Sequence, residues 1–394
     1  MPNDSKYDWS TVAIAPLASL IPSMTVATLG ISLPEVRNTL FLSEMQAGSL
    51  FSVIFIVAVF SSSVAGRMSD KIGRKTILVV GIASLSLGFG LSGLSKSYVL
   101  TLGLLGVAGL GYGFITPSLY ALMSDLLPGR RGLGASFVSV AYGTGGFIGP
   151  LLASSIIEKA GWQASFFSLG VIGLFITALE IIGVKSPNRQ ATQVRVSYTR
   201  ALNRSIVLLA LAEFFGGSVF WSTASWTPTL LRTVKGLTLL ETGFVMAVWG
   251  ATPMIGALLL GAMSDRTGRR TLILTTAFPG ALAAFVVYYF LTSPSTLAAG
   301  LMIFGILKAS APTLVVALAQ DSATPESVGT ASGMVMSMHY VAAVVAPIVA
   351  ARLITGTGDM IFTMILTSTV PLILYGGLIA LARDNRPVNP DPKI

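Results

Sequence analysis

The stretch GRMSDKIGRK occupies residues 66–75 and is a short, strongly basic segment between two long apolar segments. A second stretch with the same pattern, GAMSDRTGRR, occupies residues 261–270. Every matching position lies 195 residues further along, so that Gly66 matches Gly261. This offset is close to half of the 394-residue chain. A repeat of this length predicts a protein built from two copies of one structural unit.

The composition indicates that the solvent of this chain is lipid. Apolar residues make up 53% of the sequence and charged residues 10%, and the mean hydropathy is +0.79. Soluble domains carry roughly 25% charged residues. The apolar runs are about 20 residues long, which is enough to cross the hydrocarbon core of a bilayer as helices. We therefore predict an all-α membrane protein.

We predict twelve membrane-spanning helices in two pseudo-symmetric six-helix bundles. Their ranges are residues 10–31, 45–65, 76–94, 98–122, 132–157, 163–184, 204–230, 241–262, 271–292, 296–319, 328–354 and 359–382. The longest polar interruption lies between the sixth and seventh of these helices. It predicts an N-terminal bundle of residues 1–184, a linker of residues 185–203, and a C-terminal bundle with its tail at residues 204–394.

The basic residues predict the orientation of the chain. Of the 25 lysines and arginines, 18 fall in the termini and loops on one side of the predicted bundles, and six fall on the other side. Cytoplasmic loops carry the excess of basic residues, so we expect a multi-pass protein of the cytoplasmic membrane with both termini inside the cell. The net charge of +9 then reflects contact with the lipid bilayer and not a nucleic-acid partner.

Several classes of chemistry have no residues to support them. The chain has no cysteine and one histidine, which excludes disulfides, iron–sulfur clusters and multi-histidine metal sites. It has no phosphate-binding G-x-x-x-x-G-K-[ST] motif, so we expect no ATP hydrolysis. We predict no enzymatic activity, no cofactor, no metal and no obligate protein partner.

The repeated basic stretch is predicted to form a gate at one face of the membrane. Gly66 and Gly73 permit tight turns, Asp70 can cap the next helix, and Arg74 lies within one turn of Asp70. Acids at the ends of other predicted helices offer partners for ion pairs that would latch the face shut. The predicted gate comprises Gly66, Asp70, Gly73, Arg74, Gly261, Asp265, Gly268, Arg269, Asp125 and Glu326.

These residues carry a resemblance to the major facilitator superfamily over essentially the whole chain. The family signature G-x-x-x-D-r-x-G-r-[kr] is matched by residues 66–75, and residues 261–270 are a weaker copy. The resemblance implies two bundles of inverted three-helix repeats. It also implies a substrate site between the bundles near the midplane, with access that alternates as the bundles rock.

The sequence carries signals both for and against one subfamily, the drug exporters. Residues 145–150 resemble the G-x-x-x-G-P element common in proton-coupled drug exporters. Two departures weigh against that group: the first helix carries no acid, and residues 104–113 lack the arginine that those exporters carry. A non-transporting membrane sensor is a third reading, although both basic stretches are intact.

Three ionisable residues lie near the centre of predicted helices in the C-terminal half. Lys308 is expected to bind the carboxylate of a small organic anion, with a fixed ion pair to Glu213 as the alternative. Glu213 is expected to carry the coupling proton. His339 can relay protons or serve only in packing. Glu180 is not expected to take part, because it lies near the end of the sixth helix.

Four aromatic residues complete the predicted site. Tyr112, Tyr142 and Tyr340 are candidate hydroxyl donors to the carboxylate, and Trp221 is expected to wall the cavity. The sequence thus favours a secondary active transporter that couples protons to a small organic anion such as a monocarboxylate. A proton-coupled exporter of amphipathic drugs remains the nearest alternative.

Overall fold

The computed structural model describes residues 8–127, 130–185, 203–308, 313–323 and 328–382. The described chain is helical almost throughout. Its helices are α1 (Trp9–Ile14), η2 (Ala15–Ser19), α2 (Leu20–Leu40), α3 (Glu44–Ile72), α4 (Arg74–Ser92), α5 (Tyr98–Leu126), α6 (Arg131–Gly183), α7 (Arg204–Thr233), α8 (Leu239–Gly250), α9 (Thr252–Thr267), α10 (Arg269–Phe290), α11 (Pro294–Lys308), α12 (Thr313–Asp321), α13 (Val328–Thr357) and α14 (Met360–Leu381).

These helices account for the twelve predicted spans. In the described residues, ten helical segments are long and apolar enough to cross a membrane. One of them, α6, contains two predicted spans, which meet at a kink where Gly161 has a φ of 82°. The shorter helices α11 and α12 together cover the tenth predicted span. The first span is α1, η2 and α2 in series, with a tighter 3₁₀ segment at η2.

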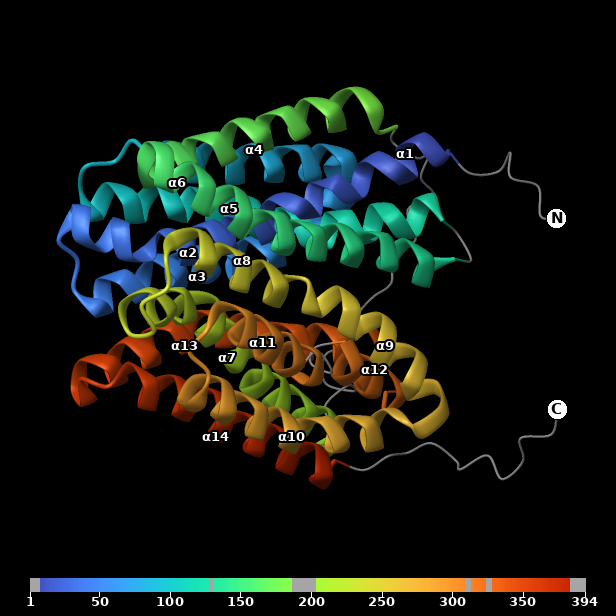
Figure 1. The fold of residues 1–394 in the computed structure, drawn as a ribbon. Helices are drawn as coiled ribbons and strands as arrows, with labels where there is room; N and C mark the ends of the chain where they lie inside the picture. Colours follow the sequence, from blue (N-terminus) through green and yellow to red (C-terminus); the bar gives the residue numbers. More distant parts are fainter. Residues whose placement is uncertain (1–7, 128–129, 186–202, 309–312, 324–327, 383–394) are drawn as a thin grey trace.

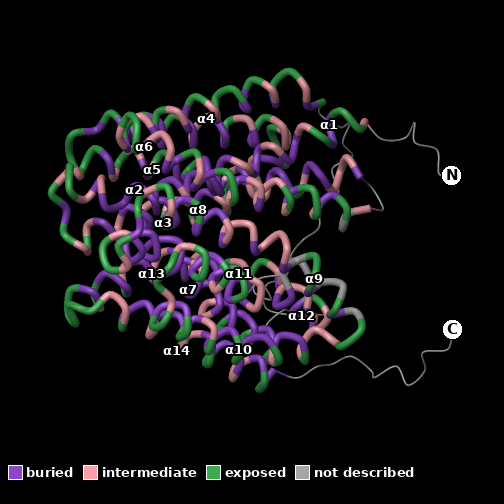
Figure 2. Tube along the Cα trace, viewed as in Figure 1, coloured by how far each residue is buried: buried purple, intermediate pink, exposed green. Residues whose placement is uncertain are grey.

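The helices form two bundles that lie side by side (Figure 1). The N-terminal half, from blue to green, holds α1 to α6, and the C-terminal half, from yellow to red, holds α7 to α14. Buried residues gather inside and between the bundles (Figure 2). The linker lies largely outside the described residues, so its bounds stay a prediction.

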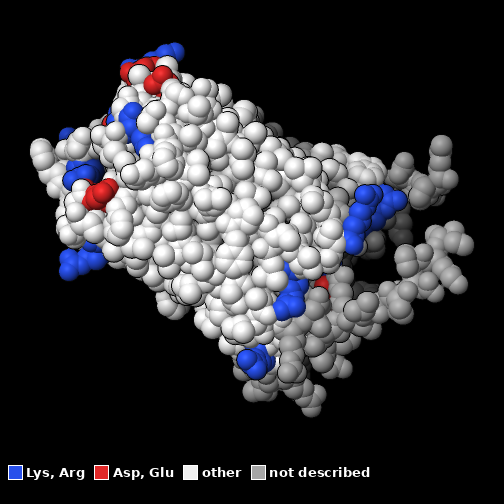
Figure 3. Space-filling view, turned by 60° about the horizontal axis from the view of Figure 1, so that its bottom comes forward, with Lys and Arg blue, Asp and Glu red and all other residues white. Residues whose placement is uncertain are grey.

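The surface is that of a protein embedded in a bilayer. On the face that Figure 3 shows, lysine, arginine, aspartate and glutamate gather toward the two ends, and an uncharged band separates them. Large apolar side chains of the helices, such as Phe60, Leu282 and Phe175, are more than 60% exposed. Contact with lipid explains that exposure. A helix satisfies its own backbone polar groups, so it can turn apolar side chains directly toward the hydrocarbon.

Two names describe the ends of the molecule below. The hairpin end is the end where α3 meets α4 and α9 meets α10. The far end is the opposite one, where α2 meets α3 and α7 meets α8.

The two halves are joined toward the far end. The Ser52 hydroxyl of α3 donates a hydrogen bond of 2.7 Å to the carbonyl oxygen of Val344 in α13. Arg232, in the last turn of α7, forms an ion pair with Glu35 of α2. At mid-height α6 and α8 touch through Gly146 and Gly250, where a Cβ atom on Gly250 would collide with the opposite backbone. Small residues thus let the halves approach closely at the far end and the middle.

Candidate functional site

A cavity of about 220 Å³ lies between the two halves. Its N-terminal wall includes Tyr112 and Tyr142, and its C-terminal wall includes Trp221, Lys308 and Tyr340. His339 also lines it. The structure therefore brings together all five residues predicted to bind substrate, and one of the two predicted to carry protons. Residues near the hairpin end, such as Leu119 and Tyr120 of α5, line it as well, so the cavity extends toward that end.

Lys308 is the last residue of α11 and is 6% exposed. Its ammonium group lies over the ring of Phe220, with Nζ 4.7 Å from the ring centroid. Such a contact stabilises a cation electrostatically but does not neutralise its charge. Within the described part of the chain, no carboxylate oxygen lies within 4.0 Å of this nitrogen. The alternative of a fixed ion pair with Glu213 is therefore not realised in this conformation.

Glu213 instead pairs with His339. The Oε1 atom of Glu213 in α7 lies 2.8 Å from Nδ1 of His339 in α13. The approach is possible because Gly217, one turn along α7, leaves room for the imidazole; a Cβ there would lie 3.0 Å from Nδ1. Glu213 is fully buried, and its Oε2 has no hydrogen-bond partner among the described residues. The imidazole thus stands between the cavity and a buried carboxyl group.

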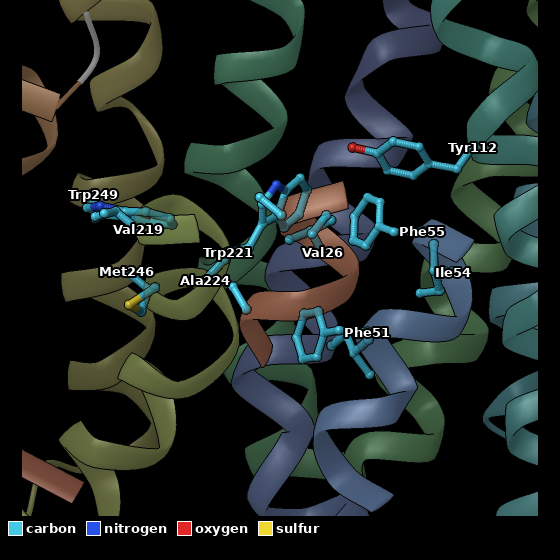
Figure 4. Close-up of a cluster of buried hydrophobic side chains, with 14 of the residues drawn as sticks. Val26, Phe51, Ile54, Phe55, Tyr112, Val219, Trp221, Ala224, Met246 and Trp249 are labelled. Carbon is cyan, nitrogen blue, oxygen red and sulfur yellow. The ribbon is translucent and has the colours of Figure 1, made fainter. Parts of the chain in front are cut away.

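Aromatic rings form much of the cavity wall. Phe220 stacks on Trp249 with ring centroids 5.1 Å apart, and it meets Trp221 edge to face at 5.0 Å. Trp221 also contacts Phe55 of the other half at 4.1 Å, and Tyr112 lies on the far side of Phe55 (Figure 4). The indole N–H of Trp221 has no hydrogen-bond partner in the described structure. It is a free donor in an otherwise apolar wall.

The tyrosines supply the polar part of the wall. The hydroxyls of Tyr112 and Tyr142 lie within interaction range of each other. The hydroxyl of Tyr340 interacts with Thr116 of α5, across the two halves. The described lining of the cavity thus presents tyrosine hydroxyls from both halves together with the ammonium group of Lys308.

The predicted gate differs from the structure in its local geometry. Gly66 lies inside α3, and Gly261 lies inside α9, so neither glycine makes a turn. The helices run on to Gly73 and Gly268, whose φ angles of 110° and 84° favour glycine and end the helix. Gly73 is the N-cap of α4, and the capping role expected of the Asp70 side chain stays a prediction, because that side chain lies outside the described residues.

The ion pairs of the predicted gate lie within each half. Arg74 of α4 pairs with Asp125 of α5, as expected. Arg269 of α10 pairs with Asp321 of α12 at 2.9 Å. Both pairs brace a hairpin against its own bundle, so in this conformation neither latches the halves together. Glu326 lies outside the described residues, as do the side chains of Asp70 and Asp265.

Three residues near these sites were missed by the sequence prediction. Asp321 lies 196 residues after Asp125, so the repeat itself contained the signal for its role. Trp249 lines the cavity, but nothing in its spacing distinguishes it from a lipid-facing residue. Glu180, which the sequence analysis set aside because it lies near a helix end, is fully buried.

Comparisons with known proteins place these features in context. A model of the Major Facilitator Superfamily matches residues 17–347 and 236–393. The chain is similar to the 3-(3-hydroxy-phenyl)propionate transporter of Escherichia coli, at 25% identity over 95% of this chain and 94% of that protein. It is 26% identical to the cis,cis-muconate transport protein of Acinetobacter baylyi over 84% of each.

Two further similarities bear on the alternatives. Multidrug resistance protein 1 of Bacillus subtilis is 28% identical over 44% of this chain and 46% of that protein. The fold matches the crystal structure of a bacterial homologue of the human lysosomal transporter Spinster in its inward-facing, occupied conformation. That match has a TM-score of 0.83 and 15% identity, over 96% of this chain and 97% of the other.

Proposed function

The chain belongs to the Major Facilitator Superfamily, and from this premise we propose that it is a secondary active transporter of a small organic anion, coupled to protons. The observation that carries the proposal is the buried ammonium of Lys308, which faces the central cavity with no carboxylate at ion-pair distance among the described residues. An intramembrane lysine costs roughly 3 kcal/mol or more, so it calls for an anionic partner. A substrate carboxylate supplies that partner.

The walls of the cavity favour a carboxylate with a flat, unsaturated body. Rings of Phe220, Trp221 and Trp249 offer faces on which such a body can stack. Hydroxyls of Tyr112 and Tyr142 on the opposite wall can bond a second polar group of the substrate. The relatives named for 3-(3-hydroxy-phenyl)propionate and cis,cis-muconate support this class, because the first molecule is an aromatic carboxylate and the second a flat, conjugated dicarboxylate. We propose a monocarboxylate of this kind.

The hairpin end is assigned to the cytoplasm, because most of the basic residues fall there. The protein then lies in the cytoplasmic membrane, and both of its termini are on the cytoplasmic side. With the halves joined toward the far end and the cavity extending toward the hairpin end, this conformation is inward-facing. The hairpins act as the moving inner gate when the bundles rock to the outward-facing state.

Coupling is assigned to the pair of Glu213 and His339. The imidazole lines the cavity and touches the buried carboxyl group, so a proton can pass from the cavity to Glu213 through the ring. Substrate that neutralises Lys308 changes the local field at Glu213, which links the two binding events.

Drug export remains the second candidate. The aromatic wall, the element at residues 145–150 and the similarity to Multidrug resistance protein 1 favour it. A lipophilic cation would have to enter a cavity that already holds the Lys308 ammonium, and the repulsion makes this the weaker assignment. The charge of the transported substrate separates the two.

The experiment that tests the proposal is uptake into proteoliposomes with an inward proton gradient, using aromatic monocarboxylates and lipophilic cations. Loss of the buried partner of an anion costs about 2–5 kcal/mol, so Lys308→Ala should lower carboxylate kcat/KM by about 100-fold. Lys308→Arg keeps the charge and should retain part of the activity, and Lys235→Ala at the far end is the control. Cation transport that is indifferent to Lys308→Ala would establish the exporter instead.

A further inference from the structure

A second buried carboxyl group lies in the N-terminal half and is not part of the cavity lining. Glu180 belongs to the last turn of α6, where this helix packs against α4 and against η2. In Figure 1 this part of α6 lies along the upper edge beside α4 and α1. The side chain of Glu180 is fully buried, and neither carboxyl oxygen has a hydrogen-bond partner in the described residues.

The charged surroundings of Glu180 are simple. The groups that act on its charge are the backbone N–H of Ala18 in η2, which approaches the carboxyl group, and the ammonium of Lys75 in α4. The 3₁₀ segment η2 carries no titratable side chain. At the start of α1, the hydroxyl of Ser10 and the ammonium of Lys185 hold the pKa of Asp8 well below its usual range.

The remaining acid nearby is already paired. Asp125 of α5 forms its ion pair with Arg74, the neighbour of Lys75. Lys75 is therefore the one cation of the surrounding described elements that is close to Glu180 and not engaged with a carboxylate. Its Nζ donates a hydrogen bond of 2.7 Å to the carbonyl oxygen of Ile181, the residue that follows Glu180.

A buried carboxylate is strongly disfavoured here, because burial removes its hydration and only the nearby Ala18 N–H and the more distant Lys75 ammonium offset that loss. The neutral acid has a far smaller penalty. We propose that Glu180 is a second proton-binding site, protonated in this conformation and able to release its proton when the Lys75 ammonium moves from the Ile181 carbonyl to the carboxylate. A role of Glu180 in coupling rests on the proposed transport function. The binding of a proton by Glu180 does not depend on that function.

The site lies between the hairpin and the cavity. Lys75 is the last residue of the first basic stretch, and Arg74 beside it braces the hairpin. On the other side, Ala18 precedes Ser19, which lines the cavity and donates a hydrogen bond of 3.0 Å to the carbonyl oxygen of Val138. When Glu180 is protonated, Lys75 holds the hairpin to the carbonyl oxygen of Ile181. When Glu180 is ionised, Lys75 holds it through an ion pair with Glu180, beside the segment of the cavity wall that contains Ser19.

The test is infrared difference spectroscopy of the full-length protein in lipid across a pH titration. The C=O stretch of a protonated carboxyl group should be present near neutral pH, be lost in Glu180→Gln and persist in Glu213→Gln. Glu158→Gln, an exposed glutamate on the same helix, is the matched control and should leave the band in place. A spectrum unchanged by Glu180→Gln overturns the proposal.

Lys75→Met separates a working proton site from a permanently neutral acid. Without the ammonium, the ionised form loses its partner, so the band should persist to a pH at least one unit higher than in the native protein. A band that does not titrate in either protein overturns the proposal. In proteoliposomes, Glu180→Gln should lower the number of protons moved with each substrate. If no substrate is transported at all, the proposed function fails while the spectra still decide this site.

Discussion

The two halves of the molecule share their hairpins and differ in their interiors. In the N-terminal half, Arg74 pairs with Asp125, and in the C-terminal half Arg269 pairs with Asp321. The next residue in each hairpin is also anchored alike. Lys75 donates a hydrogen bond to the carbonyl oxygen of Ile181 in the last turn of α6. Its counterpart Arg270 donates a hydrogen bond to the carbonyl oxygen of Ile379 near the end of α14. The elements that hold the hairpins are therefore equivalent.

The interiors use matching positions for different purposes. Position 308, a lysine, matches Gly113, where a Cβ would collide with Ser61 and the backbone of Ala58. His339 matches Gly143, where a Cβ would lie 2.6 Å from the Met254 side chain. The N-terminal half thus uses these positions for close helix packing, and the C-terminal half uses them for ionisable side chains. A symmetric mechanism of movement is combined with an asymmetric site.

The largest difference between the halves is expected to come from Glu213, the carboxylate beside the site in the C-terminal half. With Glu213→Gln the proton has no acceptor beside His339, so we expect exchange of substrate to continue while accumulation stops. A pH gradient of one unit supports about tenfold accumulation per coupled proton, and the variant should fall to equal concentrations on both sides.

The measurement is steady-state uptake beside counterflow in the same proteoliposomes, with Glu158→Gln as the control. Accumulation at the native level would show that coupling does not depend on the C-terminal half alone. In that case Glu180, in the other half, becomes the first residue to examine.

A smaller effect is expected from the hydroxyls of the N-terminal half. Tyr142→Phe keeps the ring in the cavity wall and removes one hydrogen-bonding group. A hydrogen bond of this kind contributes about 1 kcal/mol, so KM should rise by about fivefold with little change in kcat. Tyr98→Phe, whose hydroxyl bonds Ser49 at 2.8 Å outside the cavity, is the matched control. A loss of 100-fold with Tyr142→Phe would place the main partner of the anion in the N-terminal half.

The sequence predicted most of the fold because its signals are strong and local. Apolar runs of about 20 residues and the repeat at an offset of 195 residues predict twelve spans in two bundles. The details that failed depend on backbone geometry. Gly66 was expected to turn the chain, yet the helix continues to Gly73, where a positive φ ends it. A glycine in the sequence does not state which conformation its neighbours impose.

The site residues were predictable in type and not in partner. Lys308, Glu213 and His339 are conspicuous because charge inside a membrane span is rare. The pairing of Glu213 with His339, and not with Lys308, depends on the rotation of α7 against α13, which no spacing in the sequence encodes. Glu180 was set aside because it lies near a helix end, and no spacing in the sequence showed that other elements bury it. Its burial comes from α4 and η2, which are distant in sequence and pack over the end of α6.

The smallest expected effect tests the symmetric part of the comparison. In each hairpin ion pair both side chains are 16% to 27% exposed, so water weakens the attraction. A double-mutant cycle with Arg74→Gln and Asp125→Asn should give a coupling free energy of about 1 kcal/mol or less in thermal unfolding. The cycle with Arg269→Gln and Asp321→Asn should give the same value within about 0.5 kcal/mol, because the two pairs have similar exposure and span matching helices. Coupling confined to one pair would mean that the halves differ in their gates as well as in their sites.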